Sequence, residues 1–148
     1  MPPVRRWAKS VDSPASRYTC GYWRGVPDTL EQAQQQKLDL IGRKLKLEPG
    51  MRVLELGAGF GGLSYYLCTH FGVKMTCCDL SREHEVYSAE HFAHPDKTFV
   101  LQDYRDFLDE LIANDCEKFD RIVSVGMMEH EGPVNVPNFF REPRKGLR

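Results

Sequence analysis

Short apolar runs alternate with amphipathic segments along most of this chain. Four runs have the length and apolar content of buried strands, at 51–56, 73–78, 98–101 and 119–125. Helical spacing of apolar or polar residues marks the segments between and before them, at 28–45, 63–71, 81–92 and 104–113. Because strands that alternate with helices form right-handed βαβ units, the pattern predicts an α/β fold, a parallel sheet with helices on both faces.

The first helix is predicted to begin at Asp28. Asp28 and Glu31 have the spacing of a capping box, in which each side chain accepts a hydrogen bond from a free backbone N–H group. Apolar residues then recur at roughly helical spacing from Leu30 to Leu45. The Pro-Gly pair at 49–50 predicts the turn that ends this element.

Residues 1–17 show no hydrophobic periodicity and contain three prolines. We expect a flexible N-terminal arm here, followed by a single domain over residues 18–148. A solvated arm is the simpler interpretation. Four residues of the arm could instead touch a membrane surface, and these are Arg5, Arg6, Trp7 and Lys9.

Composition narrows the class of protein. The chain has 148 residues, enough for one hydrophobic core, and its 20 basic and 21 acidic residues form no dominant basic run. This charge balance does not favour a nucleic-acid partner. No apolar stretch approaches the roughly 20 residues of a transmembrane helix. We expect a cytoplasmic protein, with a peripheral position at the membrane as the alternative.

The five cysteines indicate a reducing compartment rather than a disulfide framework. Their number is odd, two of them are adjacent, and none forms a CxxC pair. His84, His91 and His94 lie in a polar segment that we expect to be a surface helix, so no metal site is predicted.

A glycine-rich loop joins the first strand to the helix that follows it. Gly57, Gly59 and Gly62 match GxGxxG between a strand and a helix, the context in which the pattern binds nucleotides. Gly57 permits a sharp turn, Gly59 lets a ligand approach the backbone, and Gly62 allows close packing of helix on strand. The pattern does not distinguish a dinucleotide from S-adenosylmethionine, and a glycine turn without a ligand is the alternative.

Acidic residues at strand ends add to this candidate site. Burying Glu55, two residues before Gly57, costs free energy unless it has a partner, which the ammonium group of S-adenosylmethionine could supply. Capping of the following loop is the other interpretation. Asp79, 22 residues after Gly57, could accept both ribose hydroxyls, although NAD enzymes share this feature. Asp103 and Tyr104 could flank adenine or serve as ordinary loop residues.

Three further segments carry a resemblance to a known family. They are YTCGYW at 18–23, LQDYRDF at 101–107 and VSVGMMEHEGP at 123–133. Together with ELGAGFGG at 55–62, they resemble the cyclopropane-fatty-acid synthase and mycolic acid methyltransferase family over about residues 18–140. The resemblance implies a Rossmann-like class I methyltransferase. It also implies transfer of a methyl or methylene group from S-adenosylmethionine to the cis double bond of an unsaturated phospholipid acyl chain at a membrane surface, with bicarbonate removing a proton.

The resemblance also implies roles for individual residues. The cofactor contacts would be Tyr18, Thr19, Glu55, Gly57, Ala58, Gly59, Gly61, Gly62, Asp79, Leu80, Ser81, His84, Asp103 and Tyr104. Cys20 and Glu129 match positions that hold bicarbonate, and His130 would orient its loop. Without the resemblance, Cys20 is as well explained by a buried structural cysteine, and Glu129 by a solvated loop carboxylate.

The chain departs from its family at the second strand and at both ends. Asp79 stands where the family usually has threonine, a change that we expect cofactor binding to tolerate. Upstream of Tyr18, a short SPAS segment replaces the segment that contacts the substrate. Four strands are predicted where a complete methyltransferase sheet has seven, and Pro143 would interrupt the helix expected after Phe140. The sequence therefore predicts a partial fold.

A partial sheet has a physical consequence. Strand 119–125 would form an apolar edge with unpaired backbone groups, so we expect marginal stability for the isolated chain. A non-enzymatic fragment or pseudoenzyme that binds cofactor or a partner is one alternative function, and a related small-molecule N-methyltransferase is another. An NAD dehydrogenase would leave Glu55 and residues 18–23 unexplained. The sequence also leaves a homo-oligomer open.

Overall fold

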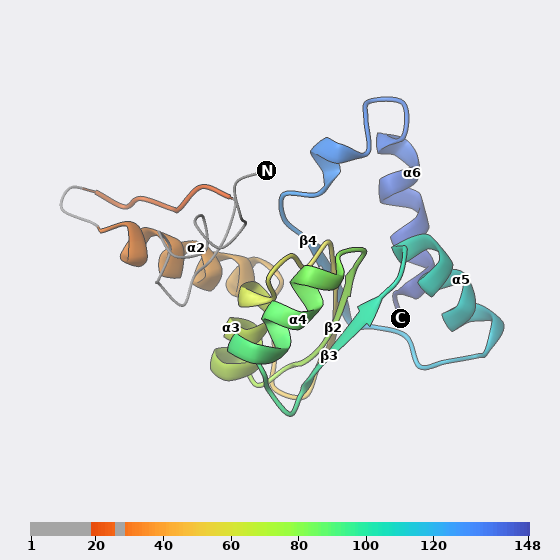
Figure 1. Ribbon diagram of the computed structural model, residues 1–148, viewed down its shortest axis with the longest axis horizontal. Coiled ribbons are helices and arrows are strands. Elements are labelled where there is room, and N and C mark those ends of the chain that lie inside the picture. Colours follow the sequence, from red (N-terminus) through yellow and green to blue (C-terminus); the bar gives the residue numbers. More distant parts are fainter. Residues whose placement is uncertain (1–18, 26–28) are drawn as a thin grey trace.

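The computed structural model describes residues 19–25 and 29–148. Within them, four parallel strands form one sheet in the order β3-β2-β1-β4 (Figure 1). The strands are β1 (Arg52–Leu56), β2 (Lys74–Asp79), β3 (Lys97–Leu101) and β4 (Arg121–Ser124). This confirms the predicted parallel α/β sheet; the largest difference in bounds is at the fourth strand, which is shorter at both ends than the predicted 119–125.

Helices lie on both faces of the sheet, as predicted (Figure 1). They are α2 (Leu30–Lys44), α3 (Gly62–Phe71), α4 (Arg82–His91), α5 (Tyr104–Ala113) and α6 (Val136–Arg141), with short 3-10 turns η1 (Met128–His130) and η2 (Glu142–Gly146). No helix among the described residues is long and apolar enough to cross a membrane.

The core consists of two apolar clusters, one on each face of the sheet. Side chains alternate along a strand, so Val53 packs toward α2 and α3 while its neighbour Leu54 packs toward α5 and α6. All four residues from Val53 to Leu56 are buried. A strand buried on both faces is rich in apolar residues, as β1 is at Val53, Leu54 and Leu56, and Glu55 is its one buried charged residue.

The cap of α2 differs from its prediction. Thr29, not Asp28, is the N-cap residue: its hydroxyl accepts from the Gln32 backbone N–H (3.2 Å), and the Gln32 side chain accepts from the Thr29 N–H (2.8 Å). The predicted pair of Asp28 and Glu31 is therefore wrong by one residue. Asp28 itself lies outside the described residues, as do Tyr18 and the expected arm at 1–17.

The C-terminal residues partly cover the far edge of β4. α6 ends at Arg141, directly before the Pro143 turn, which confirms that the helix is interrupted there. Leu147 then forms a parallel bridge with Phe119, whose N–H donates to the Gly146 carbonyl (2.8 Å). The prediction that strand 119–125 has an unpaired edge is therefore wrong at Phe119, which is paired with Leu147. From Arg121 to Ser124, β4 pairs only with β1 among the described strands.

Candidate cofactor site

The carboxyl ends of the four parallel strands lie along one edge of the sheet. The strand order changes direction between β1 and β4, because β2 and β3 lie on the other side of β1. Ligands of open α/β sheets bind at such switch points. The glycine loop lies there, between β1 and α3. It is tied to β2 because the N–H groups of Gly57 and Ala58 both donate to the Cys78 carbonyl (2.9 and 3.3 Å).

A cavity of about 280 Å³ opens beside this loop. Eight of the predicted cofactor residues line it: Thr19, Glu55, Gly57, Ala58, Gly59, Gly62, Asp79 and His84. Lys37 of α2 and Met127 after β4 also line it, although neither was predicted: Lys37 lies in no motif, and Met127 lies within the 123–133 motif but was given no role. The site residues therefore converge from segments far apart in the chain.

A second cavity, of about 450 Å³, continues from the first. Both cavities share Gly57, Asp79, Met127 and His130. The second adds the predicted residues Leu80, Asp103 and Tyr104. Two adjoining hollows suit a ligand with two chemically different ends, such as an amino acid joined to a nucleoside.

The first two glycines of the loop have different surroundings: the positive φ of Gly57 fits the predicted turn, and its contact with Met127 adds a packing role that was not predicted. Both have positive φ, +70° at Gly57 and +55° at Gly59, which favours glycine. A Cβ on Gly57 would lie 2.7 Å from the Sδ of Met127, whereas a Cβ on Gly59 would meet no protein atom within 4 Å. Gly57 is a packing position, and Gly59 faces open space that a ligand can enter.

Gly61 has a packing role that the sequence did not predict. A Cβ there would collide with the Ser88 Oγ and lie 2.9 Å from the Lys97 Nζ. Lys97 itself donates to the Ser88 hydroxyl (2.5 Å) and to the Phe92 carbonyl (2.6 Å). Burial lowers the pKa of Lys97, although nearby acidic groups, Cys77 and Glu55 among them, oppose this shift. Ser88 and Lys97 therefore support the glycine loop from the side of α4 and β3.

Asp79 is held in place by its surroundings. One carboxylate oxygen accepts from the Gly59 N–H (2.8 Å), and the other accepts from the Ser81 N–H (2.9 Å) and lies 3.1 Å from the His84 Nδ1. Burial alone would raise the pKa of Asp79, but these hydrogen bonds together outweigh it and hold the pKa below its ordinary value. Asp79 thus remains a carboxylate at neutral pH and can accept further hydrogen bonds.

Ser81 and Leu80 have lesser places in the site. Ser81 caps α4, because its hydroxyl accepts from the His84 N–H (3.2 Å). Leu80 lines the second cavity but is 71% exposed. The predicted contribution of these residues is therefore partly structural, since Ser81 fixes the start of the helix that carries His84.

Asp103 and Tyr104 line the second cavity and also begin α5. Asp103 is the N-cap of α5 and forms an ion pair with Arg105 (2.6 Å), which holds the pKa of the carboxyl below its ordinary value. Tyr104 is 5% exposed, and burial, followed by the nearby charge of Glu131, raises its pKa. Glu131 also lies 4.0 Å from Arg105, so a residue absent from the predictions links α5 to the loop after β4.

The residues expected to hold bicarbonate lie outside both cavities. Cys20 and Glu129 are exposed, so the alternative of a buried cysteine at Cys20 is wrong. Glu129 does lie near the site: its Oε1 is 3.7 Å from the Cβ position of Gly126, and the same position is 2.7 Å from the Cγ2 of Thr19. His130 lines both cavities.

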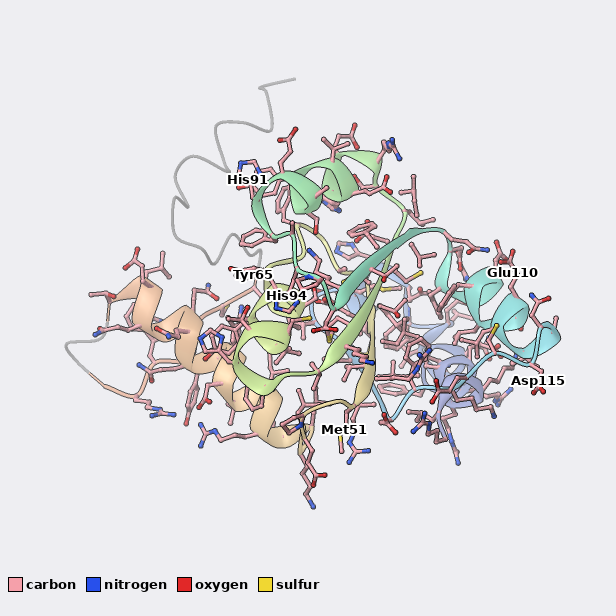
Figure 2. The ribbon with its side chains drawn as sticks, turned by 90° about the horizontal axis from the view of Figure 1, so that it is seen from below. Met51, Tyr65, His91, His94, Glu110 and Asp115 are labelled. Carbon is pink, nitrogen blue, oxygen red and sulfur yellow. The ribbon has the colours of Figure 1, made fainter. Side chains whose placement is uncertain are left out.

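Of the other cysteines, Cys68, Cys77 and Cys78 are buried and Cys116 is exposed. Burial is the main cause that raises the pKa of Cys68 to about 11 and that of Cys78 to about 12, so both are protonated thiols at neutral pH. His94 packs edge-on against Tyr65, with ring centroids 6.2 Å apart, while His91 lies at the end of α4 (Figure 2). Within residues 19–25 and 29–148, no group of three or more His, Cys, Asp or Glu side chains could hold a metal ion.

Class I S-adenosylmethionine-dependent methyltransferases and dinucleotide-binding proteins share this order of the sheet, the glycine loop and the carboxylates at the ends of β1 and β2, and comparison with known proteins places this chain with the methyltransferases. The family model described as mycolic acid cyclopropane synthetase matches residues 7–148. The chain therefore belongs to this family, as the sequence motifs predicted.

Individual relatives agree with this assignment. The chain is 43% identical over 135 residues to the cyclopropane-fatty-acyl-phospholipid synthase of Escherichia coli K12, covering 91% of this chain and 33% of that protein. It is 33% identical over 132 residues to the hydroxymycolate synthase MmaA4 of Mycobacterium tuberculosis H37Rv, covering 86% and 41%. The chain thus spans about a third of the length of the first relative and about two fifths of the second.

Solved structures show the same fold. The cyclopropane synthase MmaA2 from Mycobacterium tuberculosis matches with a TM-score of 0.78 and 31% identity, covering 92% of this chain and 46% of that one. The mycolic acid cyclopropane synthase CmaA1, complexed with SAH and CTAB, matches with a TM-score of 0.82 and 28% identity, covering 97% and 49%. Coclaurine N-methyltransferase, at 20% identity and a TM-score of 0.80, shows the fold alone.

Proposed function

We propose that this chain is the cofactor-binding part of a cyclopropane-fatty-acid synthase. The reaction would add a methyl or methylene group to the cis double bond of an unsaturated phospholipid acyl chain. One observation carries the proposal: two adjoining cavities at the strand ends are lined by eleven of the fourteen expected cofactor residues, in a chain 43% identical to the Escherichia coli phospholipid enzyme. When bound, S-adenosylmethionine supplies an electrophilic methyl group.

The residues of the site fit the two ends of that cofactor. Glu55 is 3% exposed and lines the first cavity, where its carboxylate suits the methionine ammonium group. Asp79 lies where the cavities meet and can accept the ribose hydroxyls. Tyr104 and Asp103 line the second cavity, which suits adenine. Gly59 leaves space for the ligand to approach the backbone.

Bicarbonate is part of the same proposal, with Cys20 and Glu129 as its contacts. Both side chains are exposed, and neither lines the two cavities described above. In this proposal Glu129 would hold the bicarbonate by a hydrogen bond, and the bicarbonate, rather than either side chain, would remove the proton.

A cytoplasmic location and contact with a membrane surface complete the proposal, because the substrate class is a phospholipid. Among the described strands, β4 pairs only with β1 between Arg121 and Ser124, and its other edge is where two copies could pair as a homo-oligomer.

Lipid analysis tests the catalytic claim. The chain, its Glu129→Gln variant and its Gly59→Val variant would be expressed in a bacterium that lacks its own cyclopropane synthase. Mass spectrometry of the phospholipids should show acyl chains heavier by one methylene group with the native chain and with neither variant. A folded, cofactor-binding chain that yields no such lipid would defeat the claim and favour the second candidate, cofactor binding without catalysis. The observation behind that candidate is that the chain spans only a third of the Escherichia coli relative.

A further inference from the structure

The segment 19–25 is docked along α2. The Tyr22 N–H donates to the Ala33 carbonyl (2.8 Å). A Cβ on Gly21 would lie 2.8 Å from the Cβ of Ala33, so the backbone approaches the helix closely. Ala33 is fully buried by this contact and its surroundings. These contacts fix the position of the residue that precedes them at the cavity, Thr19.

Two side chains of α2 converge on Thr19. Gln34 is 7% exposed, and its Nε2 donates to the Thr19 carbonyl (2.9 Å). The Lys37 ammonium donates to the Thr19 hydroxyl (2.6 Å) and to the same carbonyl (3.3 Å). Hydrogen bonds from a charged donor are roughly twice as strong as neutral ones, so Lys37 contributes most to this arrangement.

Thr19 is also held from the opposite side. Its Cγ2 lies 2.7 Å from the position a Cβ would take on Gly126, in the loop after β4. Thr19 is therefore enclosed between α2 and that loop. Thr19 and Lys37 line the first cavity together with Glu55.

We propose that Lys37 is a positioning residue for the amino-acid end of the cofactor. This inference rests on the proposed function and deepens it. Glu55 supplies a carboxylate suited to the methionine ammonium group, and Thr19, fixed by Lys37, supplies a hydroxyl beside a positive charge for the methionine carboxylate. The pair of charges would make the cavity select ligands that keep both groups of the amino acid.

Two ligands that differ only at this end test the inference. S-adenosylhomocysteine carries the amino-acid group, and 5′-methylthioadenosine has the same nucleoside and thioether without it. Their dissociation constants would be measured calorimetrically for the native chain and for the Lys37→Met, Lys37→Arg and Thr19→Ala variants. Lys44→Met, an exposed position on the same helix, is the matched control. Far-UV circular dichroism verifies that each variant is folded.

Lys37→Met should weaken S-adenosylhomocysteine binding by at least about tenfold, as expected for loss of a charge-assisted hydrogen bond. It should leave methylthioadenosine binding within about twofold, and Lys37→Arg should recover most of the loss. Thr19→Ala, which keeps the carbonyl, should show the same selective loss even if Lys37→Met does not fold. Equal losses for both ligands, or none for S-adenosylhomocysteine, would overturn the role of Lys37. A native chain that binds neither ligand would instead overturn the proposed function, and this inference with it.

Discussion

Adding one methyl group to each of two glycines separates protein packing from ligand access. Gly57 and Gly59 both have positive φ, so Gly57→Ala and Gly59→Ala carry the same kind of backbone strain, about 1–2 kcal/mol. Both also lower the entropy of the unfolded chain by a similar amount, which offsets about 0.4–1 kcal/mol of that strain. These two contributions therefore nearly cancel when the variants are compared.

The remaining difference comes from Met127. A Cβ on Gly57 would lie 2.7–3.0 Å from three atoms of that side chain, whereas a Cβ on Gly59 meets nothing within 4 Å. Overpacking of this kind costs about 1–3 kcal/mol. We expect the free energy of unfolding to fall by that much more in Gly57→Ala than in Gly59→Ala. Urea unfolding followed by circular dichroism measures it.

A third variant tests the stated cause. In a Met127→Ala background, the contacts of the added Cβ with the Sδ and Cγ of Met127 disappear and only the contact with its Cβ (2.9 Å) remains, so the extra cost of Gly57→Ala over Gly59→Ala should become smaller. S-adenosylhomocysteine binding should be most impaired by Gly59→Ala, at the position open to a ligand. Equal destabilisation by the two glycine variants in the native background, or a Gly57→Ala cost unchanged by Met127→Ala, would refute the reasoning.

Three further outcomes follow from burial, charge and the sheet edge. Leu108→Ala should lower stability by about 2–5 kcal/mol in urea unfolding because Leu108 is fully buried, whereas Ile112→Ala, 46% exposed on the same helix, should change it by less than about 0.5 kcal/mol. The pKa of Asp79 is lower in the folded than in the unfolded chain, so its contribution to the free energy of unfolding is present above about pH 4 and is lost as pH falls through the folded value. Asp79→Asn should therefore make the free energy of unfolding depend less on pH in the acid range. Free energies of unfolding that fall in parallel with pH for the native chain and the variant would contradict this. The isolated chain should melt below about 60 °C and aggregate through the β4 edge, while a cooperative monomeric melt well above that temperature would exclude the edge as a weakness.

Elements with strong local signals were predictable from the sequence. β1 is rich in apolar residues because both of its faces are buried, and α5 runs from Tyr104 to Ala113 as predicted because Asp103 caps it. The glycine loop and the carboxylates Glu55 and Asp79 were predictable as well, since their spacing relative to the strands places them at one edge of the sheet.

Features that depend on contacts between distant residues were not predictable. Asp28/Glu31 and Thr29/Gln32 are both plausible capping pairs, and the sequence alone does not separate two starts one residue apart. Neither the Lys97 contact behind Gly61 nor the Lys37 contact with Thr19 leaves a local pattern. The same holds for the bridge between Leu147 and Phe119, which joins residues 28 positions apart.

Calorimetric titration of the purified chain with S-adenosylmethionine tests the central claim most directly, with Gly59→Val as the control. A larger side chain at Gly59 would fill the open space beside the loop while touching no protein atom at its Cβ. We expect micromolar binding by the native chain and none by a folded Gly59→Val variant. A folded native chain that takes up no S-adenosylmethionine, or a variant that binds it equally well, would contradict the assignment of this cavity as the cofactor site.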